Sequence, residues 1–132
     1  MILIDTSAWV EFLRGTESPV CARVDELLDG QFATCHPIRM EVLAGARDDQ
    51  HLAQLRGLLA RAVLLPTEPA HYEAAAGLYR SCRRSGLTVR KLIDCLIAAQ
   101  AIDAGARLLQ HDADFELLAR CAPLQLEPTR SR

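Results

Sequence analysis

Long hydrophobic runs are absent from this sequence. A membrane-spanning helix needs about 20 consecutive apolar residues, and no segment of the 132-residue chain reaches that length. The first residues, Met1–Trp9, contain an acid where a signal peptide would continue its apolar stretch, and no basic residue precedes that stretch. We therefore expect a cytoplasmic protein that is not attached to a membrane.

Cysteine pairs at the spacing of a metal site are also absent. The five cysteines are scattered, odd in number and never separated by two residues. This pattern is typical of reduced, packed thiols and not of a disulfide framework or a zinc site. His36 and His111 each follow an expected strand, but without a ligand pair at suitable spacing they are more simply capping or solvated residues.

Lysine is almost missing, and basic charge as a whole is not in excess. The net charge of −2 excludes a generally cationic nucleic-acid binder. With one lysine in the chain, arginine supplies nearly all the positive charge, and arginine is the better bidentate partner of phosphate. Five of the 15 basic residues fall in one acid-free stretch, which fits either a solvated helix end or a phosphate-binding patch: Arg80, Arg83, Arg84, Arg90 and Lys91.

What the chain does contain is a regular alternation of short apolar runs and helical patterns. We expect strands at 1–4, 31–35, 62–65, 107–110 and 124–126, and helices at 6–14, 20–28, 37–46, 51–61, 68–84, 89–104 and 114–121. Thr6 or Ser7 is the expected cap of the first helix. This alternation predicts one three-layer α/β/α domain over 1–132, with a central, mainly parallel sheet of about five strands.

Three acids directly follow expected strands. Asp5 follows the first strand, and Asp112 and Asp114 follow the fourth. The carboxyl ends of parallel strands share one edge of the sheet, and ligands bind beyond that edge. Each acid alone is also explained as a helix cap, because aspartate is a common residue at that position.

Two further acids stand among apolar residues in expected helices. Asp94 shares its helix face with Ala98 and Ala101, and Glu41 shares its face with Ile38. Asp94 lies either in a first helical turn at the rim of the crevice or in the interior at an energetic cost. A partly buried acid among small apolar side chains indicates a bound cation.

Together these acids predict a site for a hard divalent cation. A cluster with only oxygen ligands suits Mg²⁺ or Mn²⁺ and not zinc. Without a cation, carboxylates brought this close would repel one another and raise each other's pKa. A cation held in this way activates water and stabilises charge on a phosphodiester, so metal-assisted phosphodiester hydrolysis is the expected chemistry.

These residues resemble the motifs of PIN-domain proteins over essentially the whole chain. The segments that carry the resemblance stand in the family's order and spacing: Ile2–Trp9, Glu41 with Leu43–Gly45, Asp94–Ala99 and His111–Phe115. The similarity is closest to VapC, the ribonuclease toxin of type II toxin–antitoxin modules.

The resemblance implies a Mg²⁺- or Mn²⁺-dependent endoribonuclease. Its catalytic acids correspond to Asp5, Glu41 and Asp94, with a fourth acid at Asp112 and Asp114 as the close alternative. Asp5, Asp94 and one or both of the last two would bind the cation. Glu41 would either bind it too or position and deprotonate the attacking water.

The resemblance also implies partners and supporting residues. Thr6 or Ser7 would orient an acid or a water molecule at the cation, and the basic stretch from Arg80 to Lys91 would hold the RNA backbone. VapC proteins usually form homodimers, are inhibited by a VapB antitoxin whose segment enters the acidic groove, and cut structured RNA such as tRNA or rRNA. Apolar residues that fit either the core or a dimer or antitoxin surface are Leu55, Leu58, Leu59, Tyr72, Leu78 and Tyr79.

Other functions fit the sequence less well. A signalling receiver domain needs a second acid beside Asp5 and a lysine after a late strand, whereas Thr6 follows Asp5 and Lys91 begins an expected helix. A haloacid-dehalogenase-like phosphatase needs an acid where Ser7 stands. A catalytically inactive PIN fold that only binds RNA is the remaining alternative, and retention of all the acids argues against it.

Overall fold

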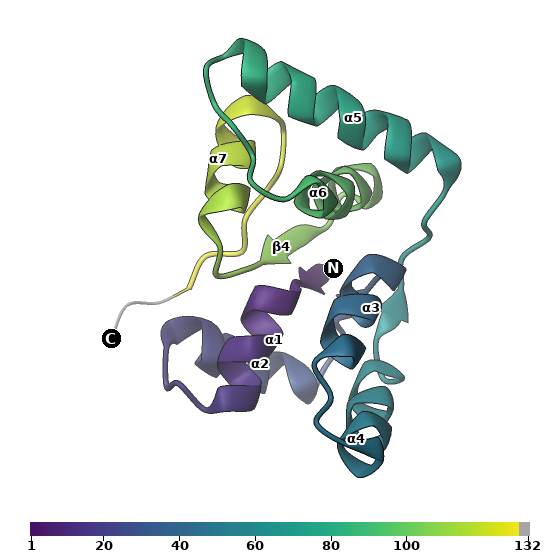
Figure 1. Ribbon diagram of the computed structural model, residues 1–132. Helices are drawn as coiled ribbons and strands as arrows, with labels where there is room; N and C mark the ends of the chain where they lie inside the picture. The colour runs from purple at the N-terminus through teal and green to yellow at the C-terminus, as the bar shows by residue number, and fades with distance from the viewer. Residues whose placement is uncertain (130–132) are drawn as a thin grey trace.

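Four short parallel strands form the centre of the structure, a computed structural model that describes residues 1–129 (Figure 1). They lie in the order β3-β2-β1-β4. The strands are β1 (Ile2–Ile4), β2 (Ala33–Thr34), β3 (Val63–Leu64) and β4 (Arg107–Leu109). The expected α/β class with a parallel sheet is confirmed, and the last three residues of the expected domain lie outside the described residues.

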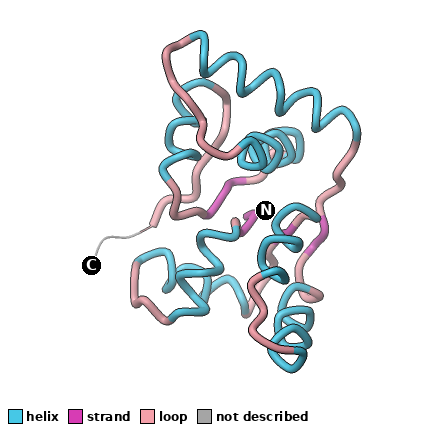
Figure 2. Tube along the Cα trace, in the orientation of Figure 1, coloured by secondary structure: helices cyan, strands magenta, loops and turns pink. Residues whose placement is uncertain are grey.

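Seven helices within residues 1–129 surround this sheet. In Figure 1, α5, α6 and α7 lie together above β4, while the first four helices lie below it. Figure 2 shows that helices make up most of the trace. Among the described residues, no helix is long and apolar enough to cross a membrane. The helices are α1 (Thr6–Arg14), α2 (Pro19–Leu28), α3 (His36–Ala44), α4 (Asp49–Leu59), α5 (Pro69–Arg84), α6 (Leu92–Ala104) and α7 (Ala113–Cys121).

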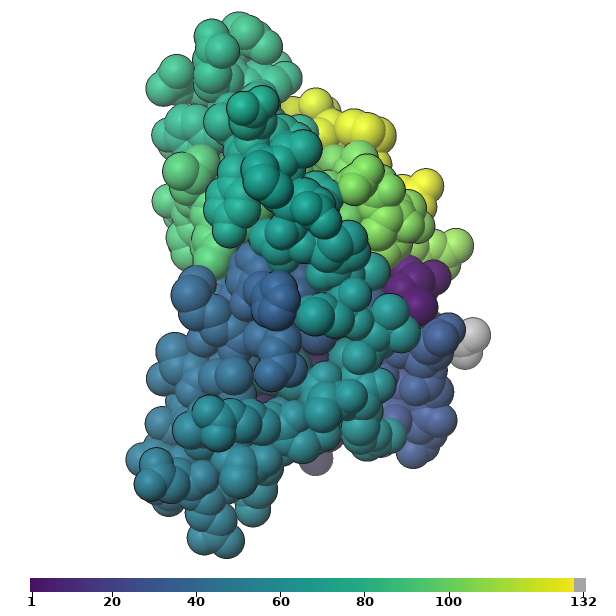
Figure 3. Space-filling view, turned by 90° about the vertical axis from the view of Figure 1, so that its right-hand side faces the viewer, coloured from purple at the N-terminus to yellow at the C-terminus, as the bar shows by residue number. Residues whose placement is uncertain are grey.

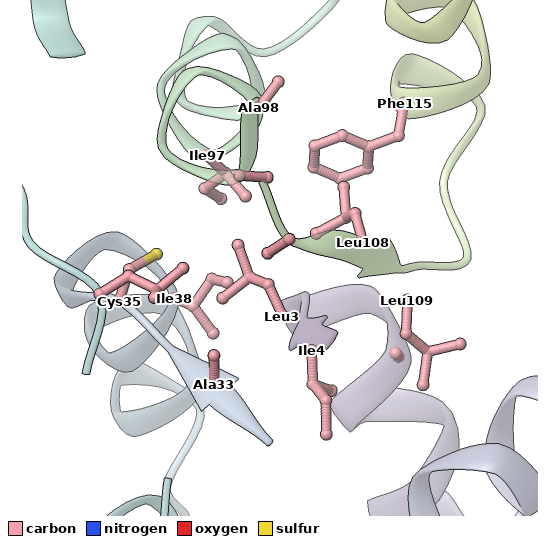
Figure 4. Packing of buried hydrophobic residues seen from close by; sticks show 14 of the residues in the cluster. Leu3, Ile4, Ala33, Cys35, Ile38, Ile97, Ala98, Leu108, Leu109 and Phe115 are labelled. Carbon is pink, nitrogen blue, oxygen red and sulfur yellow. The ribbon is translucent and has the colours of Figure 1, made fainter. Parts of the chain in front are cut away.

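The last two side chains of β1 and of β4 are buried on both faces of the sheet, as the apolar run of β1 predicts for that strand. Figure 4 shows Leu3 and Leu108 pointing toward α6 and α7, where Leu108 lies below Phe115. Ile4 and Leu109 point to the opposite side of the sheet. All five side chains are fully buried, so β1 and β4 are fixed firmly beside each other.

The expected fifth strand is only a single parallel bridge between Leu108 and Leu126. The Leu108 amide donates to the Gln125 carbonyl at 2.9 Å, and the Glu127 amide donates to the Leu108 carbonyl at 2.8 Å. Residues 124–126 thus lie beside β4, but their pairing with it is too short to form a strand. The Glu127 carboxylate, with a side chain only 4% exposed, forms an ion pair with Arg23 at 3.0 Å and thereby holds this segment against α2.

One expected helix cap and one expected helix start are wrong. Asp5, and not Thr6 or Ser7, caps α1, because the Asp5 carboxylate accepts a hydrogen bond from the Ser7 amide. The helix expected at 89–104 begins only at Leu92. Residues 89–91 stay outside the helix because the amides of Arg90 and Lys91 donate to the Asp114 carboxylate at 3.2 and 3.0 Å.

Candidate metal centre

The chain topology brings distant acids to one edge of the sheet. The strand order changes direction between β1 and β4, because β2 lies on one side of β1 and β4 on the other. A ligand crevice forms outside the carboxyl ends of the strands at such a point. The Asp5 amide donates to the Leu109 carbonyl at 3.0 Å, which fixes the ends of β1 and β4 side by side. Helix α6 leads back into β4, so its first turn, with Asp94, lies at this same edge.

The tightest group of acids consists of Asp94, Asp112 and Asp114, whose potential ligand atoms all lie within 4.8 Å of one another. An octahedral Mg²⁺ with ligands at 2.0–2.1 Å separates its ligand oxygens by about 3–4 Å. Asp5 and Glu41 lie outside this tight group but border it. The Glu41 charge helps to raise the pKa of Asp5, and the Asp5 charge helps to raise the pKa of Asp94.

Asp5 uses one carboxylate oxygen to build the fold and leaves the other without a partner. Its Oδ2 accepts hydrogen bonds from the Ser7 amide at 2.9 Å and the Ser7 hydroxyl at 2.6 Å. Its Oδ1 is buried with no hydrogen bond. Burial raises the pKa of Asp5 to about 6, against the lowering effect of the Ser7 hydrogen bonds. A buried, unpaired carboxylate oxygen is costly, and a cation would remove that cost.

Asp94 combines both positions that its sequence context allowed. It lies in the first turn of α6, and it is also only 2% exposed. Its Oδ2 is buried without a hydrogen bond. Burial, followed by a side-chain hydrogen bond with Asp114, raises the pKa of Asp94 to about 8. A carboxyl group in this state gains most from a nearby cation.

Asp112 and Asp114 differ in how many of their oxygens are already engaged. Asp112 caps α7 by accepting the Asp114 amide on Oδ1 at 2.9 Å, and its Oδ2 contacts the Lys91 ammonium at 3.1 Å. Asp114 accepts the Arg90 amide and Nε on Oδ1 and the Lys91 amide on Oδ2. Burial alone would raise the pKa of Asp114, but its hydrogen bonds with Asp94, Arg90 and Lys91 hold that pKa below the usual value.

The two hydroxyls after β1 serve different acids. The Thr6 hydroxyl donates to Glu41 Oε1 at 2.8 Å and so joins α1 to α3. The Ser7 hydroxyl donates to Asp5 and accepts the His111 amide at 2.8 Å, which ties the loop after β4 to α1. Thr6 therefore contacts Glu41, and Ser7 contacts both Asp5 and the loop that leads to Asp112 and Asp114.

The basic stretch divides into two parts in the structure. Arg90 and Lys91 lie at the acids themselves, with an Arg90–Asp112 contact of 3.0 Å. Arg83, on α5, stacks over the Tyr79 ring at 5.6 Å, and its exposed neighbours on that helix are Arg80 and Arg84. Sequence reasoning missed the pairing of Arg90 and Lys91 with acids. The signal in the sequence was that this stretch contains no acid, so any acidic partners of its basic residues had to come from elsewhere in the chain.

The donor set fits a hard divalent cation. The converging groups are carboxylates, and two of their oxygens, Asp5 Oδ1 and Asp94 Oδ2, are buried and lack hydrogen-bond partners. His36 and His111 are exposed and belong to no compact ligand group in residues 1–129. The all-oxygen chemistry favours Mg²⁺ or Mn²⁺ over zinc.

Two grooves lie beside this edge. An apolar groove of about 710 Å³ runs between α3, α5 and α6, on the side of the molecule that faces the viewer in Figure 3. Large apolar side chains at this groove are unusually exposed, with Met40 at 60%, Tyr72 at 57% and Leu92 at 60%. A second groove, of about 340 Å³, is lined by α1, α3 and α4 and reaches Glu41.

The apolar residues that fit either the core or an interface are now separated. Leu55 and Leu59 are 3% and 2% exposed and belong to the core. Leu58, Leu78 and Tyr79 are partly buried and pack against that core, whereas Tyr72 lies on the surface.

Comparisons with known proteins give one consistent result. A family model described as PIN domain matches residues 2–120. Ribonuclease VapC11 from Mycobacterium tuberculosis is 49% identical over 129 residues, which cover 95% of this chain and 96% of the relative.

Two solved structures share the fold. The Rickettsia felis VapBC2 structure, bound to a DNA fragment from the promoter, superposes with a TM-score of 0.76 at 20% identity and covers 96% of this chain and 98% of its own. VapC20 from Mycobacterium tuberculosis, a Sarcin-Ricin loop cleaving toxin, gives a TM-score of 0.68 at 14% identity, with coverage of 95% and 99%.

Proposed function

The chain belongs to the PIN-domain family, and on that premise we propose that it is a divalent-cation-dependent endoribonuclease of the VapC type. The observation that carries the proposal is a pair of buried carboxylate oxygens that accept no hydrogen bond from residues 1–129, Asp5 Oδ1 and Asp94 Oδ2, at the edge of the sheet that Asp112 shares. The preferred cation is Mg²⁺ or Mn²⁺.

In this proposal each acid has a distinct role. Asp5, Asp94 and Asp112 would hold the cation, which would supply positive charge at the phosphodiester and make water a stronger nucleophile. Glu41, held by the Thr6 hydroxyl at 2.8 Å, orients the attacking water and accepts its proton. Asp114 positions the others, because its oxygens are occupied by hydrogen bonds from Arg90 and Lys91.

The proposed substrate is structured RNA, either tRNA or rRNA. The ribonuclease name of the 49% identical relative supports this assignment. Arg80, Arg83 and Arg84 on α5 would bind the RNA backbone together with Arg90 and Lys91 at the site, so binding should weaken as salt is raised. A substrate of cellular RNA also implies a location in the cytoplasm.

We further propose that the chain is the toxin of a pair, inhibited by a VapB-type antitoxin, and that its single domain assembles as a homodimer. The similar fold from Rickettsia felis belongs to a VapBC complex, which supports the antitoxin partner. The groove that reaches Glu41 suits an antitoxin segment, and the exposed apolar residues Met40, Tyr72 and Leu92 suit contact with a second copy.

Cleavage of RNA by the purified protein tests the proposal. The protein is incubated with total cellular RNA in Mg²⁺ and, in parallel, in EDTA. We expect cleavage that EDTA stops and that Asp94→Asn abolishes without loss of the folded circular dichroism spectrum. Asp103→Asn makes the same change at the other end of α6 and should cleave like the unaltered protein.

RNA binding without EDTA-sensitive cleavage would refute the enzymatic proposal and favour an inactive binding module. Full Mg²⁺-dependent activity of Asp94→Asn would show that the site is assigned to the wrong residues.

A further inference from the structure

The only lysine of the chain points its charged group at the acids of the proposed cation site. The Lys91 ammonium lies 3.1 Å from Asp112 Oδ2 and 3.7 Å from Asp94 Oδ2. Asp94 Oδ2 is buried without any hydrogen bond, so this ammonium is the positive charge that compensates it. Two carboxylate oxygens that the proposal assigns to the cation, Asp94 Oδ2 and Asp112 Oδ2, therefore already contact the Lys91 ammonium.

Lys91 and a divalent cation cannot both keep these contacts. A bound cation would lie about 2.1 Å from each carboxylate oxygen, and an ammonium beside the same oxygens would then lie within a few ångströms of it. Repulsion between the two positive charges at that distance is substantial even when solvent partly screens it. One of the two must leave before the other takes up the oxygens.

The Lys91 side chain is free to leave while its backbone stays in place. The side chain is 51% exposed, and the ion pairs of its ammonium among the described residues are those with Asp94 and Asp112. The Lys91 amide is held separately by Asp114 Oδ2 at 3.0 Å. Rotation of the side chain into solvent therefore leaves the start of α6, and with it Asp94, undisturbed.

We propose that Lys91 is a built-in competitor for the divalent cation, which must displace the Lys91 ammonium from Asp94 and Asp112 in order to bind. Lys91 keeps the acids compensated and thereby sets the affinity of the site for its cation. The inference rests on the cation site of the proposed function but not on ribonuclease activity, so it is tested by cation binding alone.

The first test measures Mn²⁺ affinity by titration with electron paramagnetic resonance detection of free Mn²⁺. Lys91→Met keeps the length and apolar stem of the side chain but removes its charge. We expect Lys91→Met to bind Mn²⁺ about three- to tenfold more tightly than the unaltered protein, the range set by loss of partly exposed ion pairs. Lys91→Arg, which keeps the charge, should stay closer to the unaltered protein.

Arg56→Met is the matched control. It removes one positive charge from the exposed side of α4, where Arg56 makes no ion pair within residues 1–129, and should leave Mn²⁺ affinity unchanged. An equal increase in this variant would mean that net charge, and not Lys91, sets the affinity, and would overturn the inference.

The second test needs no substitution, because one lysine gives one lysine signal. In protein labelled with ¹³C only at lysine, addition of Mg²⁺ should move the Lys91 Cε resonance to the position of a free, solvated lysine and narrow it. A Lys91 resonance that stays fixed while Mg²⁺ binds would overturn the inference.

The two proposals fail in different ways. If the unaltered protein binds no Mn²⁺, the assignment of the cation site is wrong, which refutes both the cation-dependent function and the role of Lys91. If the unaltered protein binds Mn²⁺ but Lys91→Met binds it equally or more weakly, only the role of Lys91 is wrong.

Discussion

At the scale of single residues, the acids of the proposed cation site differ in how many of their carboxylate oxygens already stabilise the fold. Asp5 and Asp112 each cap a helix with one carboxylate oxygen, and the other oxygen of each faces the site. Both oxygens of Asp114 are already occupied, because Oδ1 and Oδ2 accept hydrogen bonds from the segment before α6. Helix capping and the proposed cation binding, which are alternative explanations of these acids in the sequence, are therefore compatible for Asp5 and Asp112. The same difference distinguishes Asp112 from Asp114.

Asp114→Ala is expected to destabilise the protein far more than Asp94→Asn. The alanine leaves the Arg90 and Lys91 amides without their acceptor, and we expect a loss of about 2–3 kcal/mol in the free energy of unfolding. Asp94→Asn replaces a carboxyl whose pKa is raised to about 8 by a neutral group of the same shape, so it should change stability by less than about 1 kcal/mol. Urea unfolding in EDTA measures both. Equal stabilities of Asp114→Ala and the unaltered protein would contradict the positioning role of Asp114.

At the scale of elements, the sequence predicts those helix and strand bounds that depend on neighbouring residues. It does not predict those that depend on contacts with residues far along the chain. The buried strands, the acids at their ends and most helix bounds follow from apolar runs, glycines and prolines nearby. The start of α6 does not, because residues 89–91 are compatible with a helix, whereas hydrogen bonds from Arg90 and Lys91 to Asp114, more than 20 positions later in the chain, keep them outside it. For the same reason the sequence does not predict the contacts of Lys91 with Asp94 and Asp112, since only the fold brings these residues together.

Ser7→Ala should loosen the joint between two elements. The change removes the hydroxyl that donates to Asp5 and accepts the His111 amide, so the β4–α7 loop loses its tie to α1. We expect a loss of about 1–2 kcal/mol in the free energy of unfolding and weaker Mn²⁺ binding. Thr6→Val is the matched control, because the Thr6 hydroxyl donates to Glu41 and forms no hydrogen bond with this loop among the described residues. It should reduce RNA cleavage with little change in Mn²⁺ affinity. Identical effects of the two variants on Mn²⁺ binding would argue against separate roles.

At the scale of the whole molecule, the site concentrates buried carboxyl groups, which makes stability and cation binding depend on pH. The pKa of Asp5 is raised to about 6 and that of Asp94 to about 8, whereas an aspartate in the unfolded chain has a pKa of about 3.9. Between these values the folded, cation-free protein binds more protons than the unfolded chain. Its stability is therefore greatest at low pH within this window and declines as pH rises.

In EDTA, the free energy of unfolding should fall between pH 5 and pH 8, by up to about 1.4 kcal/mol per pH unit for each carboxyl that is still protonated in the folded protein and already ionised in the unfolded chain. Saturating Mg²⁺ should offset most of this fall, because the cation binds the ionised carboxylates of the folded state. Urea unfolding across this range provides the measurement, and the Asp5→Asn/Asp94→Asn double variant should lose most of the dependence. A cation-free protein that becomes more stable toward pH 8 would contradict the burial of these two acids.

The central claim, that the edge of the sheet beside β1 and β4 holds a divalent cation, is tested most directly by a crystal structure of the protein with Mn²⁺. We predict an anomalous difference peak in bonding contact with Asp94 and Asp112 and close to Asp5 Oδ1, with the Lys91 ammonium moved away from it. A map without a peak at these acids at saturating Mn²⁺, or with its only peak elsewhere on the molecule, would contradict the claim.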